Sequence, residues 1–241
     1  MISLEDTLLN MSKINVSVDC VIFGFDDTEK KLKVLTIEKK INPFSNKLHK
    51  KTQFAIPGDL INVNEDIDDA ANRILYRLTK LDKLYLKQFK TFGNPTRVND
   101  DKDKEWLNNF RANPNERVIT IGYVSIVRME DYIPQASYFA HDASWADIEN
   151  IPEMAFDHNL IVNDAIQFLK SEINHEVTSE LLPRKFTLSQ LQELYEIILN
   201  EKLDKRNFRK QIINKGILEK TNEKQKGVSH KPAELYKFNQ Q

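Results

Sequence analysis

Apolar residues fall into four strand-like segments within the first 130 residues of the chain. Their side chains are largely β-branched or aromatic, and the segments are residues 14–25, 32–39, 84–92 and 116–129. Alternating or nearly continuous apolar positions of this kind predict β-strands, and the polar turn between the first two segments predicts a hairpin. Residues 53–59 form a shorter apolar run, which Pro57 and Gly58 bring to an end.

Two further segments carry apolar residues at helical spacing. Between residues 66 and 80 they recur at i, i+3, i+4, i+7, i+8 and i+11, as Ile67, Ala70, Ala71, Ile74, Leu75 and Leu78. This spacing predicts an amphipathic helix, and a second helix is predicted over residues 159–170. The order of elements predicts an α+β fold whose sheet comes largely from the first 130 residues. The polar residues 99–109 predict a loop, which is either a lid or an insertion without regular structure.

The last 60 residues or so show a different arrangement. Thr187 and Gln190 form a capping-box pattern before a helical run, and Asp204 is a candidate N-cap for a second helix. Gly216 follows at the position of a left-handed C-cap. Two strand-like runs, ILEKT and ELYKF, then flank a basic turn. Two helices followed by a hairpin with a charged tip predict a winged helix-turn-helix.

Charge becomes informative only when the chain is divided. A length of 241 residues fits one large or two modest domains, and the formal net charge of −1 indicates no partner. Residues 183–241, however, carry 13 basic and 7 acidic side chains, a net charge of +6, while the rest of the chain carries −7. We therefore predict two domains with opposite charge, residues 1–176 and residues 177–241.

Composition also excludes several classes of protein. The single cysteine, Cys20, excludes a disulfide framework and a four-cysteine zinc site within one chain, and we expect it to be a buried apolar residue. No stretch is long and apolar enough to span a membrane, and the amino terminus, MISLEDTLLN, lacks the basic region of a secretory signal. A cytoplasmic protein is expected.

The second helix of the carboxyl-terminal region has a polar side suited to DNA. Successive helical residues advance by about 100°, so Phe208 and Ile212, with Ile213 at the margin, fall on one side. Asn214 lies on the other side among cations and amides, which can bind phosphates, guanine or adenine. The predicted DNA-binding residues are Lys205, Arg206, Asn207, Arg209, Lys210, Gln211 and, with His230 on the wing, Lys231. The alternative is an ordinary solvated surface.

Residues 57–81, PGDLINVNEDIDDAANRILYRLTKL, resemble a Nudix box. The residues that keep the register of that family's pattern are Glu65, Arg73, Leu75 and Leu81. The residues that depart from it, mostly at glycine and glutamate positions, are Asp59, Ile74, Arg77, Leu78 and Lys80. In the family, the helix glutamates hold divalent metal ions that polarise a diphosphate. We therefore predict a degenerate box with no metal site, no catalytic residue and no enzyme activity.

A degenerate Nudix-like domain followed by a winged helix resembles the Nudix-related transcriptional regulators. These include NrtR-type repressors of NAD metabolism and sugar-responsive relatives. The resemblance covers nearly the whole chain and is most specific in residues 181–221 and in PAELYKF, with further matches in TFGNPTR (91–97) and FDH (156–158). It implies a Nudix-like mixed sheet that senses an effector and forms a homodimer, a winged helix that binds a double-stranded DNA operator, and no cofactor.

The effector is open between two classes of small molecule. One is a pentose such as L-arabinose, and the other is ADP-ribose or a related nucleotide. We favour a sugar, because the metal-binding glutamates are lost and no glycine-rich phosphate loop is present. The candidate effector-binding residues are Asp59, Glu65, Arg73, Arg77 and Arg97, with Asn94 and Arg117 nearby. Asp157 and His158 are expected to be a helix cap and a packed histidine.

Three functional hypotheses follow from these patterns. The leading one is a regulator, in its commoner form a repressor released by its effector, because the basic winged helix follows a degraded catalytic box. The rival is a Nudix hydrolase with an atypical metal site, since Glu65 and Arg73 are retained in register. The third is a scaffold whose carboxyl-terminal hairpin contacts a partner protein.

Overall fold

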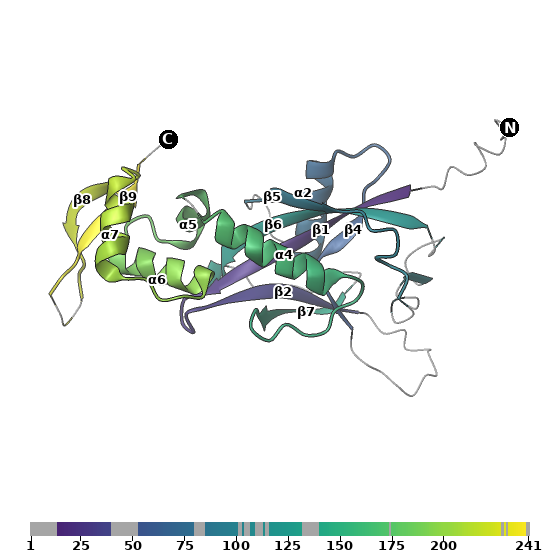
Figure 1. Ribbon diagram of the computed structural model, residues 1–241, viewed down its shortest axis with the longest axis horizontal. Coiled ribbons are helices and arrows are strands. Elements are labelled where there is room, and N and C mark those ends of the chain that lie inside the picture. The colour runs from purple at the N-terminus through teal and green to yellow at the C-terminus, as the bar shows by residue number, and fades with distance from the viewer. Residues whose placement is uncertain are drawn as a thin grey trace.

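The computed structural model describes residues 14–39, 53–79, 85–100, 103, 107–108, 113, 116–131, 140–173, 175–227, 229 and 231–239. A mixed β-sheet forms one end of the molecule, and a smaller unit of helices and a two-stranded sheet forms the other (Figure 1). Two helices cover the opposite faces of the larger sheet, α2 (Ile67–Thr79) and α4 (His158–Ser171). The predicted α+β fold is confirmed.

Two long strands form the centre of the sheet. β1 (Ile14–Asp26) pairs in parallel with β6 (Arg117–Arg128) along almost its whole length. β2 (Lys31–Lys39) returns antiparallel to β1 after a turn in which Lys30 has a φ of 56°, so the predicted hairpin is confirmed. The strand order is β3-β2-β1-β6-β5, with β4 paired to β1 and β7 paired to β2. The shorter strands are β3 (Phe54–Ala55), β4 (Gly58–Leu60), β5 (Lys87–Phe92) and β7 (Ala140–Asp147).

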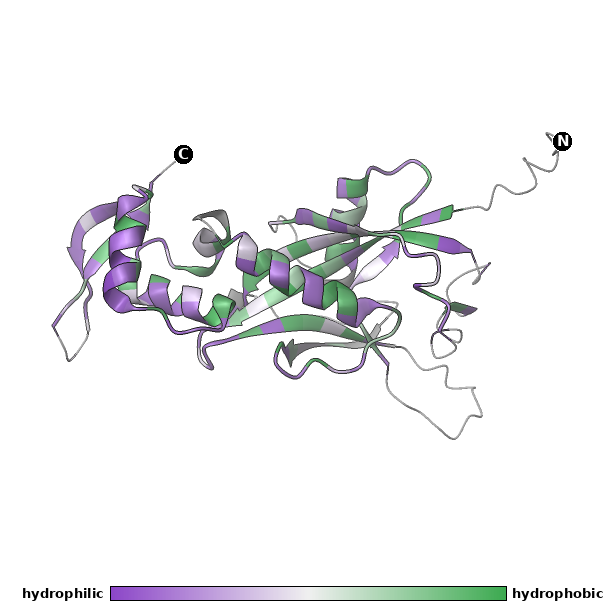
Figure 2. Cartoon of the chain, viewed as in Figure 1, coloured by the Kyte–Doolittle hydropathy of each residue, from purple (hydrophilic) through white to green (hydrophobic). Residues whose placement is uncertain are grey.

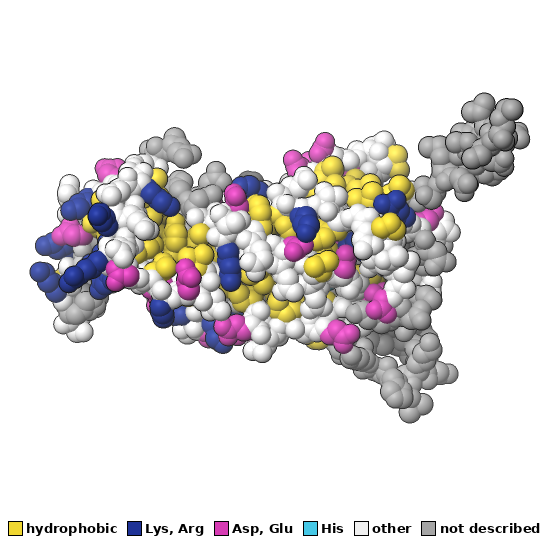
Figure 3. Space-filling model, viewed as in Figure 1, with side chains coloured by type: hydrophobic (Ala, Val, Ile, Leu, Met, Phe, Trp, Pro, Cys, Tyr) yellow, Lys and Arg dark blue, Asp and Glu magenta, His cyan; other side chains and the backbone are white. Residues whose placement is uncertain are grey.

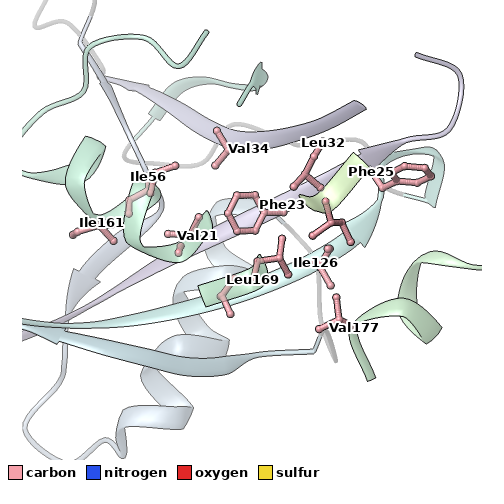
Figure 4. Close-up of a cluster of buried hydrophobic side chains, with 14 of the residues drawn as sticks. Val21, Phe23, Phe25, Leu32, Val34, Ile56, Ile126, Ile161, Leu169 and Val177 are labelled. Atoms are coloured by element: carbon pink, nitrogen blue, oxygen red, sulfur yellow. The ribbon is translucent and has the colours of Figure 1, made fainter. Parts of the chain in front are cut away.

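Alternation along β1 divides the core of the sheet into two layers. Cys20 and Ile22 point to the layer under α2, while Val21 and Phe23 point to the layer under α4 (Figure 4). Both sides of the strand are therefore buried, as its continuous apolar pattern predicts. Burial raises the pKa of the Cys20 thiol, which fits its expected role as a small buried apolar residue.

The smaller unit has the predicted winged-helix layout. Thr187 Oγ accepts a hydrogen bond from the Gln190 backbone N–H, and the Gln190 side chain accepts one from the Thr187 N–H, which completes the capping box. Asp204 accepts a hydrogen bond from the Asn207 backbone N–H at 2.8 Å, and Gly216 has a φ of 66° just beyond the second helix. The helices and strands of the smaller unit are α5 (His175–Leu181), α6 (Leu188–Leu199), α7 (Lys205–Asn214), β8 (Leu218–Lys224) and β9 (Glu234–Phe238).

Helix α6 contributes side chains to two hydrophobic cores. Leu191 and Tyr195 are buried with α7 in the core of the winged helix. Leu194 and Ile198, on another side of the same helix, are buried in the cluster that contains Phe23 of the sheet. The winged helix is therefore joined to the sheet by shared core packing as well as by the chain connection.

A crevice of about 390 Å³ lies beside this joint, between the β1–β2 turn, the end of β7 and the carboxyl-terminal half of α6. Ion pairs border the crevice. Lys30 Nζ lies 3.4 Å from a Glu193 carboxylate oxygen across the joint, and Lys202 Nζ lies 2.8 Å from Glu196 within the winged helix. None of the five candidate effector-binding residues lines the crevice.

The apolar pattern missed two elements and misplaced the ends of others. β7 and α5 were not predicted, the strand predicted over 84–92 begins at Lys87, and the apolar run 53–59 contains β3 and the start of β4. The predicted domain boundary after residue 176 lies inside α5 and stays a prediction. Within the predicted loop 99–109, Leu107 is buried, and most of the other residues lie outside the described part of the chain. No helix among the described residues is both long and apolar enough to cross a membrane.

Candidate functional sites

Helix α7 turns one polar side to solvent. Phe208 and Ile212 are buried in the winged-helix core, as the spacing predicts. Ile213 is 51% exposed, which corrects its predicted place at the margin of the core: the packed side of the helix is narrower than its apolar composition suggests. The exposed residues of the outward face of α7 are Arg206, Asn207, Lys210, Gln211 and Asn214. Figure 2 shows much of this helix in the hydrophilic colour.

Cations on this helix are largely free of internal partners. Lys205, Arg206 and Lys210 are exposed and form no ion pair with another described residue. Arg209 differs, because it is partly buried and its Nη2 donates a hydrogen bond to Ser189 Oγ of α6 at 3.3 Å. Three of the four predicted cations of α7 are therefore available to an external anion, and the fourth is partly used in holding α7 against α6.

The hairpin of the winged helix neutralises many of its own charges. Its carboxylates pair with lysines of the same unit, as Lys185 with Glu223 at 2.6 Å, Lys224 with Glu234 at 3.7 Å and Lys237 with Glu219 at 3.0 Å. Lys231 is exposed at the turn between the strands, while His230 lies outside the described residues. Lysine and arginine side chains gather at this end of the molecule (Figure 3).

The Nudix-box residues meet in one ion-pair cluster on α2 and the loop before it. Arg73 binds Glu65 through Nε at 2.5 Å and Nη2 at 2.9 Å, donates a hydrogen bond to the Leu60 carbonyl, and reaches Asp59 at 3.2 Å. Arg77 lies 3.7 Å from the same Asp59 carboxylate. Hydrogen bonds from Arg73 and the Asn62 backbone lower the pKa of Glu65 to about 2. Four of the five predicted effector-binding residues are thus brought together.

The fifth candidate, Arg97, belongs to a separate buried network. Its guanidinium is 4% exposed, forms two hydrogen bonds with Asp157 at 2.9 and 2.6 Å, and also donates to the Thr120 hydroxyl. Asp157 therefore holds Arg97 with its side chain and does not cap α4 with it, which corrects the expected role of that carboxylate. Of the two further candidates, Asn94 closes a turn with Thr96, and Arg117 donates a hydrogen bond to the Gly93 carbonyl.

Asp19 is a member of this network that the pattern of residues did not single out. Its carboxylate lies 3.7 Å from Arg97 Nη2 and 3.6 Å from His158 Nε2, and it is almost fully buried. His158 Nδ1 accepts a hydrogen bond from the Ile56 backbone N–H, so the expected packed histidine is confirmed. A Cβ at Gly58 would come within 2.0 Å of the Asp19 carboxylate, which explains why the neighbouring strand carries glycine there. The sequence signal that could have identified Asp19 is an acidic residue in the middle of a mostly apolar strand.

The described residues do not fit a metal site of the Nudix kind. Within the described part of the chain, no group of three His, Cys, Asp or Glu side chains lies close enough together to hold a metal ion. Ile74, at a glutamate position of the Nudix pattern, is buried in the core under α2, and Arg77 occupies another such position.

Comparison with known proteins finds a family match for the winged helix. Residues 178–238 match the protein family described as the NrtR DNA-binding winged helix domain. The "ADPR responsive transcriptional repressor NtrR" of Acinetobacter baylyi is 29% identical over 228 residues, covering 92% of this chain and 81% of that protein. The winged helix of this chain is thus similar to that of NrtR-type proteins.

Structural similarity extends the NrtR likeness to the whole fold. The crystal structure of Shewanella oneidensis NrtR complexed with a 27mer DNA superposes with a TM-score of 0.68 at 24% identity, covering 93% of each chain. The chain therefore has the same fold, a Nudix-like mixed sheet with helices followed by a winged helix. An "ADP-ribose pyrophosphatase" of Methanocaldococcus jannaschii is also similar, 28% identical over 153 residues, which cover 64% of this chain and 73% of that protein.

These relatives change the balance between the two effector hypotheses. Both curated relatives carry ADP-ribose in their names, and neither name refers to a sugar. The expectation of a pentose such as L-arabinose is therefore not supported, and the nucleotide alternative fits the comparisons better. The preference for a sugar rested on the lost glutamates and on the missing glycine-rich phosphate loop, and neither absence removes the other ways in which a protein binds a nucleotide.

Proposed function

We propose that this chain is a transcriptional repressor that binds an operator through its winged helix and responds to ADP-ribose or a related nucleotide through its Nudix-like domain. One observation carries the proposal: the residues that match the NrtR DNA-binding winged helix domain contain α7, whose outward face presents cations and amides with no side-chain partner among the described residues. The similarity to the A. baylyi repressor over 92% of the chain supports the same function.

The winged helix supplies both kinds of contact that DNA binding requires. Lys205, Arg206 and Lys210 present cations to the phosphates or to guanine, and Asn207 and Gln211 present amides to base edges. Arg209 joins them at the edge of α7 and Lys231 at the wing. In this proposal α7 lies in the major groove as a recognition helix, the wing lies against the neighbouring backbone, and the seven residues face the DNA or its edge.

The effector site is proposed around the remnant of the Nudix box. Asp59, Glu65, Arg73 and Arg77 form a cluster whose charges balance, so a diphosphate needs a guanidinium that can turn outward. Arg77 is that group in our proposal, because it is 43% exposed while Arg73 is held by the two hydrogen bonds that it donates to Glu65. Arg97 contributes by fixing the loop after β5. With a cation at a former metal position, we propose that the domain binds the nucleotide without hydrolysing it.

A salt titration tests the DNA-binding part of the proposal. The full-length protein is expected to prefer the promoter region next to its gene over random DNA, and the logarithm of affinity should fall linearly with the logarithm of salt concentration. A variant in which both Arg206 and Lys210 are replaced by Gln should have a less steep slope, smaller in magnitude by about 2 for each winged helix. Lys237→Gln is the matched control, because Lys237 is already paired with Glu219. Equal slopes for all three proteins, or no preference for the promoter, would contradict the proposal.

A thermal-shift comparison tests the effector. ADP-ribose is expected to raise the melting temperature with a saturable dependence on concentration, since stabilisation follows RT ln(1 + [L]/Kd). L-arabinose should give no shift. Incubation with ADP-ribose and Mg²⁺ or Mn²⁺ should release no AMP. Turnover that disappears in Glu65→Gln would instead support a hydrolase.

We further propose that the repressor acts as a homodimer. A dimer presents two copies of α7, which can read two half-sites one or more helical turns apart. Sedimentation of the full-length protein with and without operator measures this directly, and a monomer bound to a single half-site would refute it.

A further inference from the structure

The outward face of α7, with the exposed Ile213 at its edge, consists of two stripes that run along the helix. One stripe contains amides at i, i+4 and i+7, which are Asn207, Gln211 and Asn214. The other contains two cations and an apolar residue, which are Arg206, Lys210 and Ile213. At about 100° per residue the two stripes lie side by side on the helix surface. DNA bound to this face of the helix would therefore contact both stripes.

The amide stripe is not used inside the protein. The side chains of Asn207, Gln211 and Asn214 form no hydrogen bond with another described residue; the one bond of Asn207 to Asp204 is made by its backbone. A carboxamide can both donate to and accept from adenine, matching its N6 and N7 atoms in the major groove. Three such groups on one stripe favour A·T pairs over G·C pairs.

Ile213 provides a second, independent indication of the same base pairs. It is 51% exposed on a helix whose other apolar residues, Phe208 and Ile212, are buried. An apolar side chain in the major groove contacts the C5-methyl group of thymine. An A·T pair presents that methyl group and the N6 and N7 atoms of adenine in the same groove, so the amide stripe and Ile213 complement the same kind of base pair.

We propose that α7 reads an A·T-rich half-site, with Asn207 and Gln211 pairing with adenines and Ile213 contacting a thymine methyl group. The inference rests on the proposed DNA binding and adds to it the class of sequence that is recognised. Four residues of helix span about 6 Å, close to two base-pair steps of about 3.4 Å, so the two amides can meet separate adenines.

Selection followed by replacement of single base atoms tests the proposal. Full-length protein selects its preferred sites from a random duplex library, and each thymine of the selected half-site is then replaced in turn by deoxyuridine, which lacks only the methyl group. One replacement should weaken binding of the wild type about fourfold, the effect of removing one buried methyl group. The same replacement should leave the affinity of Ile213→Ala unchanged.

A parallel set of duplexes tests the amides. Replacing the contacted adenine by 7-deazaadenine removes the N7 acceptor and should weaken wild-type binding about tenfold or more. Gln211→Ala should lose this penalty at one adenine, and Asn207→Ala at another. Lys210→Gln is the matched control on the same helix, because it should weaken binding to every duplex while keeping the penalties for deoxyuridine and 7-deazaadenine.

The outcomes separate this inference from the function on which it rests. Selected sites rich in G·C pairs, or a deoxyuridine penalty that persists in Ile213→Ala, would overturn the inference and leave DNA binding intact. Failure of the wild type to bind any duplex would overturn the proposed function and this inference with it. Because all the substituted side chains are exposed, circular dichroism should show unchanged folding in each variant.

Discussion

Single arginines of the Nudix-like domain show how burial determines what a charge contributes. Arg97 is 4% exposed and lies between Asp157 and Asp19, whereas Arg77 is 43% exposed and approaches Asp59 at 3.7 Å. Removing one partner of a buried ion pair leaves an uncompensated charge and costs about 3–5 kcal/mol. Exposed pairs contribute about 0–1 kcal/mol. The two arginines therefore have different tasks, one in holding the fold and one facing solvent.

Matched substitutions test this difference. Arg97→Met should lower the free energy of unfolding by about 3–5 kcal/mol, because the buried Asp19 and the partly buried Asp157 lose their cation. Arg77→Met should lower it by less than about 1 kcal/mol and should weaken ADP-ribose binding. Urea unfolding measures the first effect and calorimetric titration the second. Equal losses of stability in the two variants would show that the buried network does not hold the fold.

The Glu65–Arg73 pair predicts a dependence of stability on pH. Hydrogen bonds lower the pKa of Glu65 to about 2 in the folded protein, against about 4.3 in an unfolded chain. The folded pKa is the lower one, so the stabilising contribution is fully present above pH ~4.3 and is lost as the pH falls towards 2. The stability difference between the wild type and Glu65→Gln should therefore be constant near neutral pH and shrink below pH ~4.3. Glu180→Gln, an exposed residue of α5 without an ion pair to a described residue, should show no such change.

At the scale of elements, α6 joins the two parts of the molecule. Its Leu194 and Ile198 are buried in the core of the sheet, and its Leu191 and Tyr195 in the core of the winged helix. A helix shared in this way couples the packing of the winged helix to that of the sheet. Any change that an effector causes in the sheet can then reach α7 through α6.

Calorimetry of α6 variants tests this joint. The full chain should unfold in one transition, and Ile198→Ala should lower its stability by about 2–5 kcal/mol and separate the unfolding of the winged helix from that of the sheet. Leu191→Ala is the control on the same helix. It should destabilise the winged-helix core without loosening the contact with the sheet. Two transitions in the wild type would contradict a shared core.

The elements that were predicted correctly are those whose own sequence decides them. α2, α6 and α7 have strong helical spacing or complete caps, and β1 and β6 are long and apolar. β7 reads AHDASWAD and has neither property, so its pairing with β2 defines it as a strand. α5 has seven residues, too few to show a period, and packing against β6 through Val177 and Leu181 supports it.

The candidate sites differ in the same way: local sequence patterns predict some of them, and distant segments of the chain form the others. The polar face of α7 follows from the period of one helix, and only Ile213, at the edge of the packed side, was misplaced. The cluster of Asp59, Glu65, Arg73 and Arg77 comes from one continuous motif. Asp19 and Arg97, in contrast, are brought together by strands and loops far apart in the chain, and no local pattern encodes their contact.

At the scale of the molecule, charge is separated along its length. Residues 183–241 carry +6 and the rest carries −7, and the winged helix forms one end of the molecule (Figures 1 and 3). A negatively charged Nudix-like domain is repelled by DNA, while the basic end is attracted to it. The electrostatic field therefore presents α7 and the wing to the duplex first.

Regulation by an effector requires two states of this molecule that differ in DNA affinity. The effector can change that affinity only as far as its own affinity differs between the two states, typically by about 1–3 kcal/mol, or about 5–150-fold. Linkage also requires that operator DNA weaken effector binding by the same factor.

The most direct test of the account is a titration of operator DNA with full-length protein at fixed salt, with and without saturating ADP-ribose. The account predicts specific binding that ADP-ribose weakens about 5–150-fold, and a loss of operator binding without loss of ADP-ribose binding in the variant with Arg206 and Lys210 replaced by Gln. Operator affinity that is the same with and without ADP-ribose would contradict it.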